Sequence, residues 1–292
     1  NAISCVKVGD TVNAVLMFTE LIGISNSEYQ QSALTFLARK YYTEDDYDNS
    51  NIYYQTLEKV ALNNSLKREA IIRLMYGNEK LKPELAYNYA QKVINLDKTD
   101  DWLISKAKII VARGQFFSGN YAKSKTTFEK VVELSDYDEG AEAKYYLAYL
   151  MYLDDSLALA EKMIFELAKN YNSDYFIAKA FILLADIYVL QENDFQAKAT
   201  LESIIENHDG EELVNLARKN WELIIERESV GRVIKDNPQS YIEFLEEEID
   251  YDLTEFLIED VIEEEYREMA PENLIVPKTD SLGITNEYIN ID

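Results

Sequence analysis

The sequence has few of the residues that build tight turns, disulfides and metal sites. Its 292 residues include only 9 Gly, 4 Pro, 1 Cys and 1 His. The scarcity of Gly and Pro argues against sandwiches, barrels and doubly wound sheets, which need many sharp turns. One thiol cannot form an internal disulfide, and a single Cys and a single His exclude metal sites built from clusters of either residue. We therefore expect no metal and no other cofactor.

Basic residues are also scarce, since 29 Lys and Arg stand against 54 Asp and Glu, for a net charge of −25. Such a charge disfavours binding to phosphate backbones, so we expect no nucleic-acid partner. No apolar run approaches the roughly 20 residues of a membrane span. The stretch 1–16 also lacks the basic start and apolar run of a signal peptide. We expect no direct insertion into a membrane.

The acidic residues are concentrated at one end of the chain. Residues 236–292 contain 18 acidic and two basic residues, a net charge of −16, whereas residues 1–235 contain 36 and 27, a net charge of −9. Gly231 and Asn237-Pro238 mark the boundary, because Pro is tolerated only in the first turn of a helix. We expect 236–292 to be an acidic, helical tail that docks back on the chain or covers a convex flank. Its apolar residues have helical spacing: Ile242, Leu245, Ile249, Leu253, Phe256, Leu257 and Val261.

A repeat of about 36 residues organises the remaining chain. Steps of 36 to 38 residues connect six positions that, with one exception, hold alanine: Ala2, Ala38, Leu74, Ala112, Ala148 and Ala185. The residue twelve positions later is small in every unit: Ala14, Ser50, Ala86, Ser124, Ala160 and Ala197. A small residue late in one helix and another early in the next let two helices approach closely. The repeat therefore predicts helical hairpins that stack into a solenoid.

Small and large residues in this order, with Tyr47 or Tyr121 three residues before the second small position, resemble tetratricopeptide repeats (TPR). The resemblance covers residues 1–207 and implies a right-handed all-α solenoid of five to six hairpins. The sequence departs from the family in its longer steps, in the absence of the closing Pro and in Leu74, which replaces a small residue. The segment 178–205 further resembles the last repeats of large envelope-associated bacterial proteins.

Both ends of the predicted array differ from its middle. Residues 208–230 would form a capping helix, with an apolar face between Glu211 and Arg227 that covers the last hairpin. The register begins at Ala2, so the first hairpin would have almost no first helix. We expect an open apolar face there, unless more chain or a partner covers it: Ala14, Phe18 and Leu21.

The TPR resemblance also places a set of residues on the concave wall, which first helices line in that family: Arg39, Tyr42, Arg68, Met75, Lys106, Arg113, Phe116, Phe117, Tyr145, Tyr149, Tyr152 and Lys179. Aromatic and Arg side chains are common energetic anchors of protein interfaces. We therefore expect a groove for an extended or helical segment that carries carboxylates and apolar anchors. Alternatively, the tyrosines pack between repeats and the basic side chains pair locally with Asp or Glu.

Catalytic constellations are not evident in the sequence. It has one imidazole, His208, no Gly-rich phosphate loop, and acidic runs such as 246–248 that lack the pattern of a calcium loop. We predict a non-enzymatic scaffold or adaptor that binds a protein or peptide, or its own acidic tail, within a larger chain or complex. A glycan- or peptidoglycan-binding module that uses the groove aromatics is the alternative, and an enzyme with a carboxylate pair is a third hypothesis.

The location of the protein follows only from the resemblance. Similarity to envelope-associated repeat proteins implies a bacterial envelope or secretion assembly. It therefore implies the periplasm of a Gram-negative bacterium, with the cytoplasm as the alternative, because one thiol fits either compartment.

Overall fold

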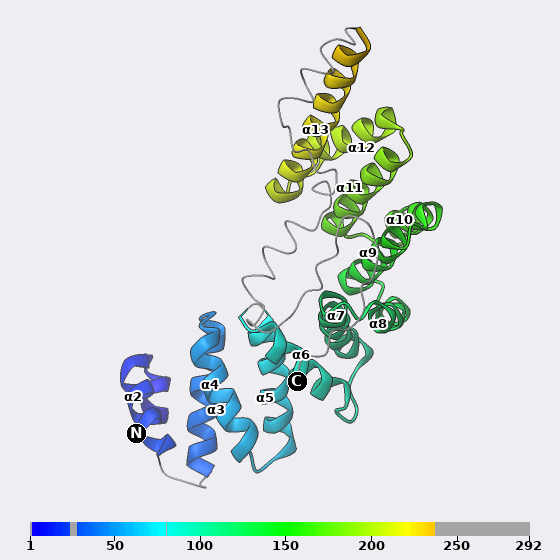
Figure 1. The fold of residues 1–292 in the computed structure, drawn as a ribbon. Coiled ribbons are helices and arrows are strands. Elements are labelled where there is room, and N and C mark those ends of the chain that lie inside the picture. The colour runs from blue at the N-terminus through cyan, green and yellow to red at the C-terminus, as the bar shows by residue number, and fades with distance from the viewer. Residues whose placement is uncertain (1, 24–27, 80, 237–292) are drawn as a thin grey trace, which may run out of the picture.

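A computed structural model describes residues 2–23, 28–79 and 81–236. These residues form thirteen α-helices and contain no strand. Twelve helices follow one another as six hairpins, and a long thirteenth helix ends the series (Figure 1). Their bounds are α1 (Ala2–Lys7), α2 (Thr11–Ile22), α3 (Glu28–Thr43), α4 (Tyr47–Val60), α5 (Asn64–Glu79), α6 (Pro83–Ile94), α7 (Asp101–Phe117), α8 (Tyr121–Leu134), α9 (Asp138–Leu153), α10 (Leu157–Asn170), α11 (Asp174–Leu190), α12 (Asp194–Asn207) and α13 (Glu211–Asp236).

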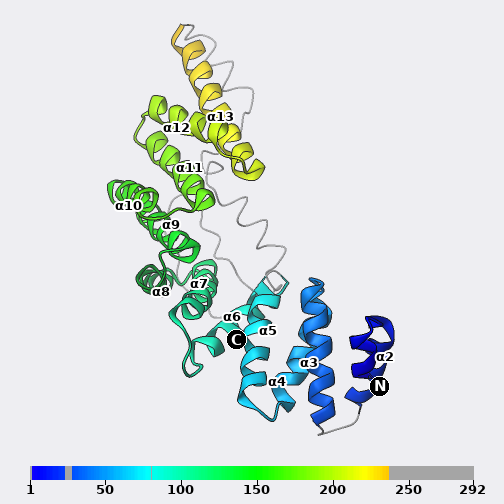
Figure 2. The ribbon, with the colours of Figure 1, turned by 180° about the vertical axis from the view of Figure 1, so that it is seen from behind.

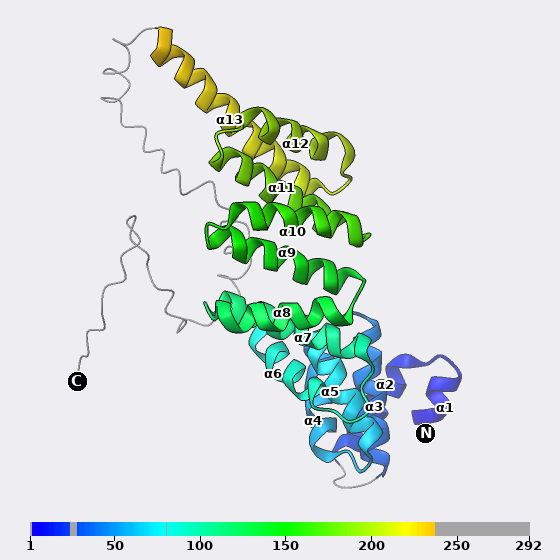
Figure 3. The ribbon, with the colours of Figure 1, turned by 90° about the vertical axis from the view of Figure 1, so that its right-hand side faces the viewer.

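The hairpins stack in chain order into a curved array. Each second helix packs both on its own first helix and on the first helix of the next hairpin. In the C-terminal half, α7, α9 and α11 lie on one side of the curve and α8, α10 and α12 on the other, as the front and back views show (Figures 1 and 2). The side view shows the helices of this half as successive layers (Figure 3). The predicted all-α solenoid is confirmed.

The repeat in the sequence is also the register in which the helices pack. Its six first-helix positions are at most 7% exposed, and its six second-helix positions are at most 1% exposed. Ser50 Oγ donates a hydrogen bond to the carbonyl oxygen of Ala38 at 3.0 Å, which joins the two positions within one hairpin. Small side chains at these crossings let the helix backbones approach. Leu74 is fully buried as well, so the third hairpin accommodates a larger residue there.

Five hairpins share one kind of turn. Seven residues after the small position, one residue has a positive φ between 54° and 78°: Gly9, Asp45, Gly119, Asp155 and Glu192. The next residue donates its backbone N–H to a carbonyl five residues upstream, for example Asn120 N to Gln115 O at 2.8 Å. This Schellman-type turn ends the first helix. The residue that donates this N–H is also the N-cap residue of the second helix, as Asn120 is for α8. The third hairpin instead enters its second helix at Pro83.

The first hairpin packs on α3 through the residues that were expected to form an open face. Ala14 is fully buried, and Phe18 is 5% exposed and stacks on Phe36 with ring centroids 4.4 Å apart. The expectation of an open face at Ala14, Phe18 and Leu21 is therefore wrong, because the following hairpin buries the first two and the half-buried Leu21 packs against the same cluster. The exposed apolar side chains of this hairpin are different ones: Ile3, Val6, Val8, Val12, Leu16 and Met17.

The last hairpin is covered by α13, which buries Leu213, Ala217 and Ile224. This helix continues through Gly231, which the sequence interpretation took as a breaker. A helix interior tolerates a single Gly at a cost of about 1 kcal/mol. The helix runs to Asp236, immediately before Asn237-Pro238. The predicted tail lies beyond that point, outside the described residues.

Direct packing between first helices distinguishes the two halves of the array. In the C-terminal half, α9 contacts both α7 and α11, and α11 contacts α13. Among the described residues, no comparable packing joins α3 to α5 or α5 to α7. The first helices therefore lie closer together in the C-terminal half than in the N-terminal half.

Candidate partner-binding face

Four residues that the sequence placed on the groove wall lie in the core. Met75 and Tyr145 are fully buried, Phe116 is 7% exposed and Tyr149 is 4% exposed. Tyr145 stacks on Tyr149 with ring centroids 6.2 Å apart, and Phe116 lies 5.8 Å from Tyr149. The burial of all four corrects the expectation that they line an open surface. They fill the space between successive hairpins.

The other three predicted aromatic residues are half-buried and pack at the margin of this core. Tyr152 stacks on Tyr149 at 5.9 Å, and Phe117 meets Phe116 edge-on at 5.3 Å. Tyr42 has the guanidinium of Arg73 4.5 Å from its ring centroid. These contacts match the alternative interpretation, in which the aromatic side chains pack between repeats.

The predicted basic residues of the N-terminal half bond to the following hairpin or to the connection that leads to it. Arg39 donates from Nε and Nη2 to the Glu69 carboxylate at 2.6 and 2.5 Å. This bidentate pair raises the pKa of Arg39 and lowers that of Glu69. Arg68 Nη1 donates to the carbonyl of Asp97 at 2.8 Å, and Nη2 lies 3.2 Å from Thr99 Oγ1.

Further along the array, the predicted basic residues join an ionic cluster around a cavity of about 170 Å³. Arg113 on α7 pairs with Glu79 on α5, and its Nε lies 3.2 Å from Glu142 Oε1 on α9. Lys106 pairs with Glu139. Burial raises the pKa of Glu142, although the positive charge of Arg113 acts in the opposite direction.

The last predicted basic residue, Lys179, sits over two rings, with Nζ 5.4 Å from the Tyr145 centroid and 5.5 Å from that of Tyr175. Sequence reasoning missed two carboxylates that share these surfaces, Glu69 and Glu139. A usable signal was present, because opposite charges 30 to 34 residues apart pair across neighbouring hairpins, as in Arg39–Glu69 and Arg113–Glu79. A separation of 30 to 34 residues is shorter than the repeat of about 36 residues by about one helical turn.

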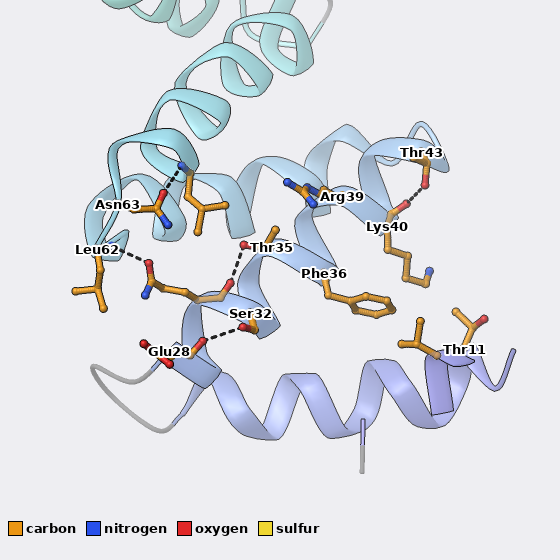
Figure 4. Close-up of a pocket in the computed structure, with 13 residues that line it drawn as sticks. Thr11, Glu28, Ser32, Thr35, Phe36, Arg39, Lys40, Thr43, Leu62 and Asn63 are labelled. Carbon is orange, nitrogen blue, oxygen red and sulfur yellow. Dashed lines mark hydrogen bonds between the residues drawn. The ribbon is translucent and has the colours of Figure 1, made fainter. Parts of the chain in front are cut away.

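A hollow of about 1040 Å³ lies between the first hairpin, α3 and the start of α5. Its apolar wall consists of Val6, Phe36, Leu62 and Leu66. Figure 4 shows Phe36 extending from α3 toward the side where Thr11 lies. Of the twelve predicted groove residues, only Arg39 lines this hollow.

The polar wall of the hollow offers mostly hydrogen-bond acceptors and cations. Ser32 Oγ donates to Glu28 O at 2.9 Å, Thr35 Oγ1 to Gln31 O at 2.7 Å, and Thr43 Oγ1 to Lys40 O at 2.8 Å. Because each hydroxyl donates to its own helix, its oxygen keeps lone pairs for an incoming N–H. Arg39 and Lys40 also line the hollow, and each is paired with a carboxylate, Arg39 with Glu69 and Lys40 with Glu44 at 2.5 Å. The hollow thus combines apolar contact with acceptors for N–H groups.

The hairpins stack one on the next, and the small residues of the repeat are buried where their helices cross. The repeats are tetratricopeptide-like. No protein-family model matches the chain, and no curated protein does so. The solved structures that are similar to it include the following two. One is the MamA protein, with 16% identity, a TM-score of 0.45 and coverage of 62% of this chain and 96% of that chain. The other is the TPR domain of P58(IPK), with 13% identity, a TM-score of 0.36 and coverage of 78% and 64%.

In the part of the chain that the structure describes, no helix is long and apolar enough to cross a membrane. No three His, Cys, Asp or Glu side chains there are grouped as metal ligands. His208 follows the last turn of α12, and the Cys5 thiol is free and half-buried in α1.

Proposed function

We propose that this chain is a non-enzymatic scaffold that binds a segment of a partner protein in the hollow between the first hairpin, α3 and α5. The observation that carries the proposal is the hollow itself, at about 1040 Å³. It lies in the half of the array where the backbones of the first helices α3 and α5 do not approach as closely as those of α7 and α9. Ligand sites occupy roughly 300–1,000 Å³, so the hollow has room for several side chains of a bound segment.

The lining favours a polypeptide over other ligands. Leu62 is 72% exposed and Val6 is 42% exposed, so apolar side chains of a partner would bury surface that now faces water. Arg39 and Lys40 are paired with Glu69 and Glu44, so a carboxylate on the same segment would bind by competing with these pairs. A sugar ligand has less support, because Phe116, Tyr145 and Tyr149 are buried and do not offer faces for stacking.

A variant that fills the hollow tests the proposal. Ser32→Trp places a large ring in the hollow from an exposed position of α3. Asn88→Trp is the matched control, because Asn88 is exposed on α6 and does not line the hollow. Immobilised wild-type and variant chains are compared in the capture of proteins from an extract, with thermal unfolding as a check on folding.

We expect Ser32→Trp to lose most of the captured protein while Asn88→Trp keeps it, with both variants unfolding close to the wild-type temperature. Equal capture by the wild type and Ser32→Trp would overturn the assignment of the site.

We further propose that the scaffold belongs to a bacterial envelope or secretion assembly and works in the periplasm of a Gram-negative bacterium. The support is the resemblance of the segment 178–205 to the last repeats of envelope-associated proteins. Fractionation of the source cells, with an antibody against the chain, tests this placement. Recovery in the periplasmic extract is expected, and recovery with the cytoplasmic fraction would contradict the proposal.

A further inference from the structure

We infer that one edge of the C-terminal half of the array binds a basic, extended segment of a partner protein. This edge consists of the connections that lead into α7, α9, α11 and α13, together with the first two residues of each helix. We call it the acidic edge, and it comprises residues 95–102, 135–139, 171–175 and 208–212. It lies away from the hollow of the N-terminal half, so the inference goes beyond the proposed function.

The four parts of the acidic edge are neighbours in space. The helix α9 contacts both α7 and α11, and α11 contacts α13. The side view shows the α8–α9 connection and the α9–α10 turn at opposite ends of α9 (Figure 3). At the start of α11, Tyr175 Oη donates to Glu212 Oε1 at the start of α13, at 3.4 Å. A Cβ on Gly140, in the first turn of α9, would stand 2.6 Å from the ring of Tyr171. The acidic edge therefore follows one side of the array.

The acidic edge holds all of the excess negative charge of its half. Residues 95–235 contain 25 acidic and 17 basic residues. Of these, the 23 residues of the edge contain 10 acidic and one basic, a net charge of −9. The other 118 residues contain 15 acidic and 16 basic, a net charge of +1. Connections between hairpins are not acidic in general, because residues 61–63 between α4 and α5 include no charged side chain.

The carboxylates of the edge are not used to hold the fold together. Asp100 is the N-cap residue of α7 but makes no side-chain cap hydrogen bond. Asp136 and Asp209 precede the first helical turns, in which an acidic residue stabilises the helix dipole. Six exposed carboxylates form no ion pair within the described residues: Asp100, Asp101, Asp136, Asp138, Asp174 and Asp209. A bound cation would lower the repulsion between them.

Aromatic rings are exposed at the same edge, one on each of three successive first helices. Tyr137, the N-cap residue of α9, is 76% exposed. Trp102 on α7 is 56% exposed, and Tyr175 on α11 is 39% exposed. The ring of Tyr175 already holds a cation, since Lys179 Nζ lies 5.5 Å from its centroid. Trp102 and Tyr137 offer the same kind of contact to a cation of a partner.

The spacing of the edge favours an extended ligand. Neighbouring packed helices lie about 8–10 Å apart. An extended or polyproline chain advances about 3.1–3.4 Å for each residue, so side chains three residues apart reach successive hairpins. The ligand is therefore a segment with Arg or Lys at every third position. Its cations would stack on Trp102 and Tyr137 and pair with the carboxylates beside them.

A synthetic peptide of four Arg-Pro-Ser units is the probe, because it has arginine at every third position and favours an extended conformation. Its affinity for the full chain is measured by fluorescence anisotropy. Two further peptides control the ligand. One has the same composition with its four arginines adjacent, and the other has glutamine in place of arginine. We expect both to bind at least about fivefold more weakly than the probe.

Two variants of equal charge test where the probe binds. Asp100→Asn/Asp136→Asn/Asp174→Asn removes three charges from the acidic edge. Glu246→Gln/Glu247→Gln/Glu248→Gln removes three charges from another acidic stretch, outside the described residues. We expect the first variant to weaken binding at least about fivefold and the second less than about twofold, with thermal unfolding as a check on folding. Equal losses would show attraction by net charge alone and would overturn the inference.

A second pair of variants tests the rings. Trp102→Ser/Tyr137→Ser should weaken binding of the probe at least about fivefold. Leu190→Ser/Phe195→Ser is the control and should bind as the wild type does, because these exposed residues lie at the α11–α12 turn, at the other end of α11. Unchanged binding by Trp102→Ser/Tyr137→Ser would overturn the inference. So would displacement of the probe by an equimolar amount of Ca²⁺, which would identify the edge as a metal site.

Discussion

At the scale of single residues, the inner face of the C-terminal half contains buried polar groups with few partners. The hydroxyl of Tyr145 is buried and has no hydrogen-bond partner among the described residues. Asp186 is 8% exposed, and the contact it accepts from Asn220 Nδ2 is long, at 3.4 Å. Burying a polar group without a good partner costs free energy, so these positions are sensitive tests of the packing.

Tyr145→Phe removes the unpartnered hydroxyl and keeps the ring. We expect the free energy of unfolding to rise by about 1 kcal/mol, since the variant no longer buries an unsatisfied oxygen. Tyr54→Phe is the control, because the Tyr54 hydroxyl donates to Glu69 Oε1 at 3.3 Å and its loss lowers stability. Denaturant unfolding of both variants measures the difference. A loss of stability in Tyr145→Phe as large as that in Tyr54→Phe would show that its hydroxyl has a partner after all.

The Asp186 carboxyl gives stability a dependence on pH. Burial raises its pKa well above the ordinary value for Asp, so the folded chain favours the protonated form. Its contribution to stability is fully present below the pKa of the unfolded chain, about 3.9, and is lost as the pH rises above that value.

Asp186→Asn, which keeps the shape and cannot ionise, should lose less stability than the wild type between pH 4 and pH 7. Thermal unfolding across this range checks the prediction, and parallel curves for the two chains would contradict it. Other buried acids such as Glu142 affect both chains equally, so the difference between the curves isolates Asp186.

At the scale of helices and turns, the connections decide how closely hairpins approach. Gly140, in the first turn of α9, faces the preceding connection. A Cβ at this position would clash with the carbonyl oxygen of Ser135 and stand 2.6 Å from the ring of Tyr171. The close approach of α8, α9 and the end of α10 therefore requires a residue without a side chain.

Gly140→Ala should destabilise the chain by about 2 kcal/mol, because a backbone carbonyl cannot move away as a flexible side chain can. Gly23→Ala is the matched control, since a Cβ there meets its nearest atom, Glu20 O, at an ordinary 3.5 Å and φ is −66°. We expect the control to unfold at or above the wild-type denaturant midpoint. Equal midpoints for Gly140→Ala and the wild type would show that the connection can relax.

At the scale of the whole molecule, the array is held together by contacts between neighbours. Each hairpin packs on the one before and the one after, and the apolar core is continuous from α3 to α13. A smaller cluster joins the first hairpin to α3. In such a one-dimensional array, a local defect spreads mainly to adjacent repeats.

Ala148→Leu introduces a larger side chain at a fully buried crossing of α9. Overpacking of this kind costs about 1–3 kcal/mol. We expect hydrogen exchange to accelerate in α7 to α12 and to stay unchanged in α2 and α3, because the latter do not contact the defect. Ala158→Leu, at an exposed position of α10, is the control. Uniform acceleration along the chain would mean that the array unfolds as one unit.

Much of the fold could be predicted because it depends on local spacing. The small residues twelve positions apart, as at Ala148 and Ala160, define both helices of a hairpin and the point where they cross. The end of α13 was less predictable, because the cost of Gly231 within a helix is small compared with the gain from continued helical hydrogen bonding.

The candidate site was less predictable for a physical reason. The register identifies which residues of a first helix face inward, but burial there depends on the distance between neighbouring first helices. Where α9 packs directly on α7 and α11, inward-facing Tyr145 is core, and where α3 and α5 are further apart, inward-facing Arg39 borders a hollow. The separation of helices in different repeats is a tertiary property.

The sequence by itself determined the helical hairpins, their order and the apolar register on which they stack, because 3.6-residue periodicity and small residues act over a few turns. Only the tertiary structure decided which inward residues remain open, since that depends on how far each hairpin rotates against the next. It also decided the ion pairs, because carboxylates such as Glu69 come within reach of Arg39 only after two hairpins have stacked.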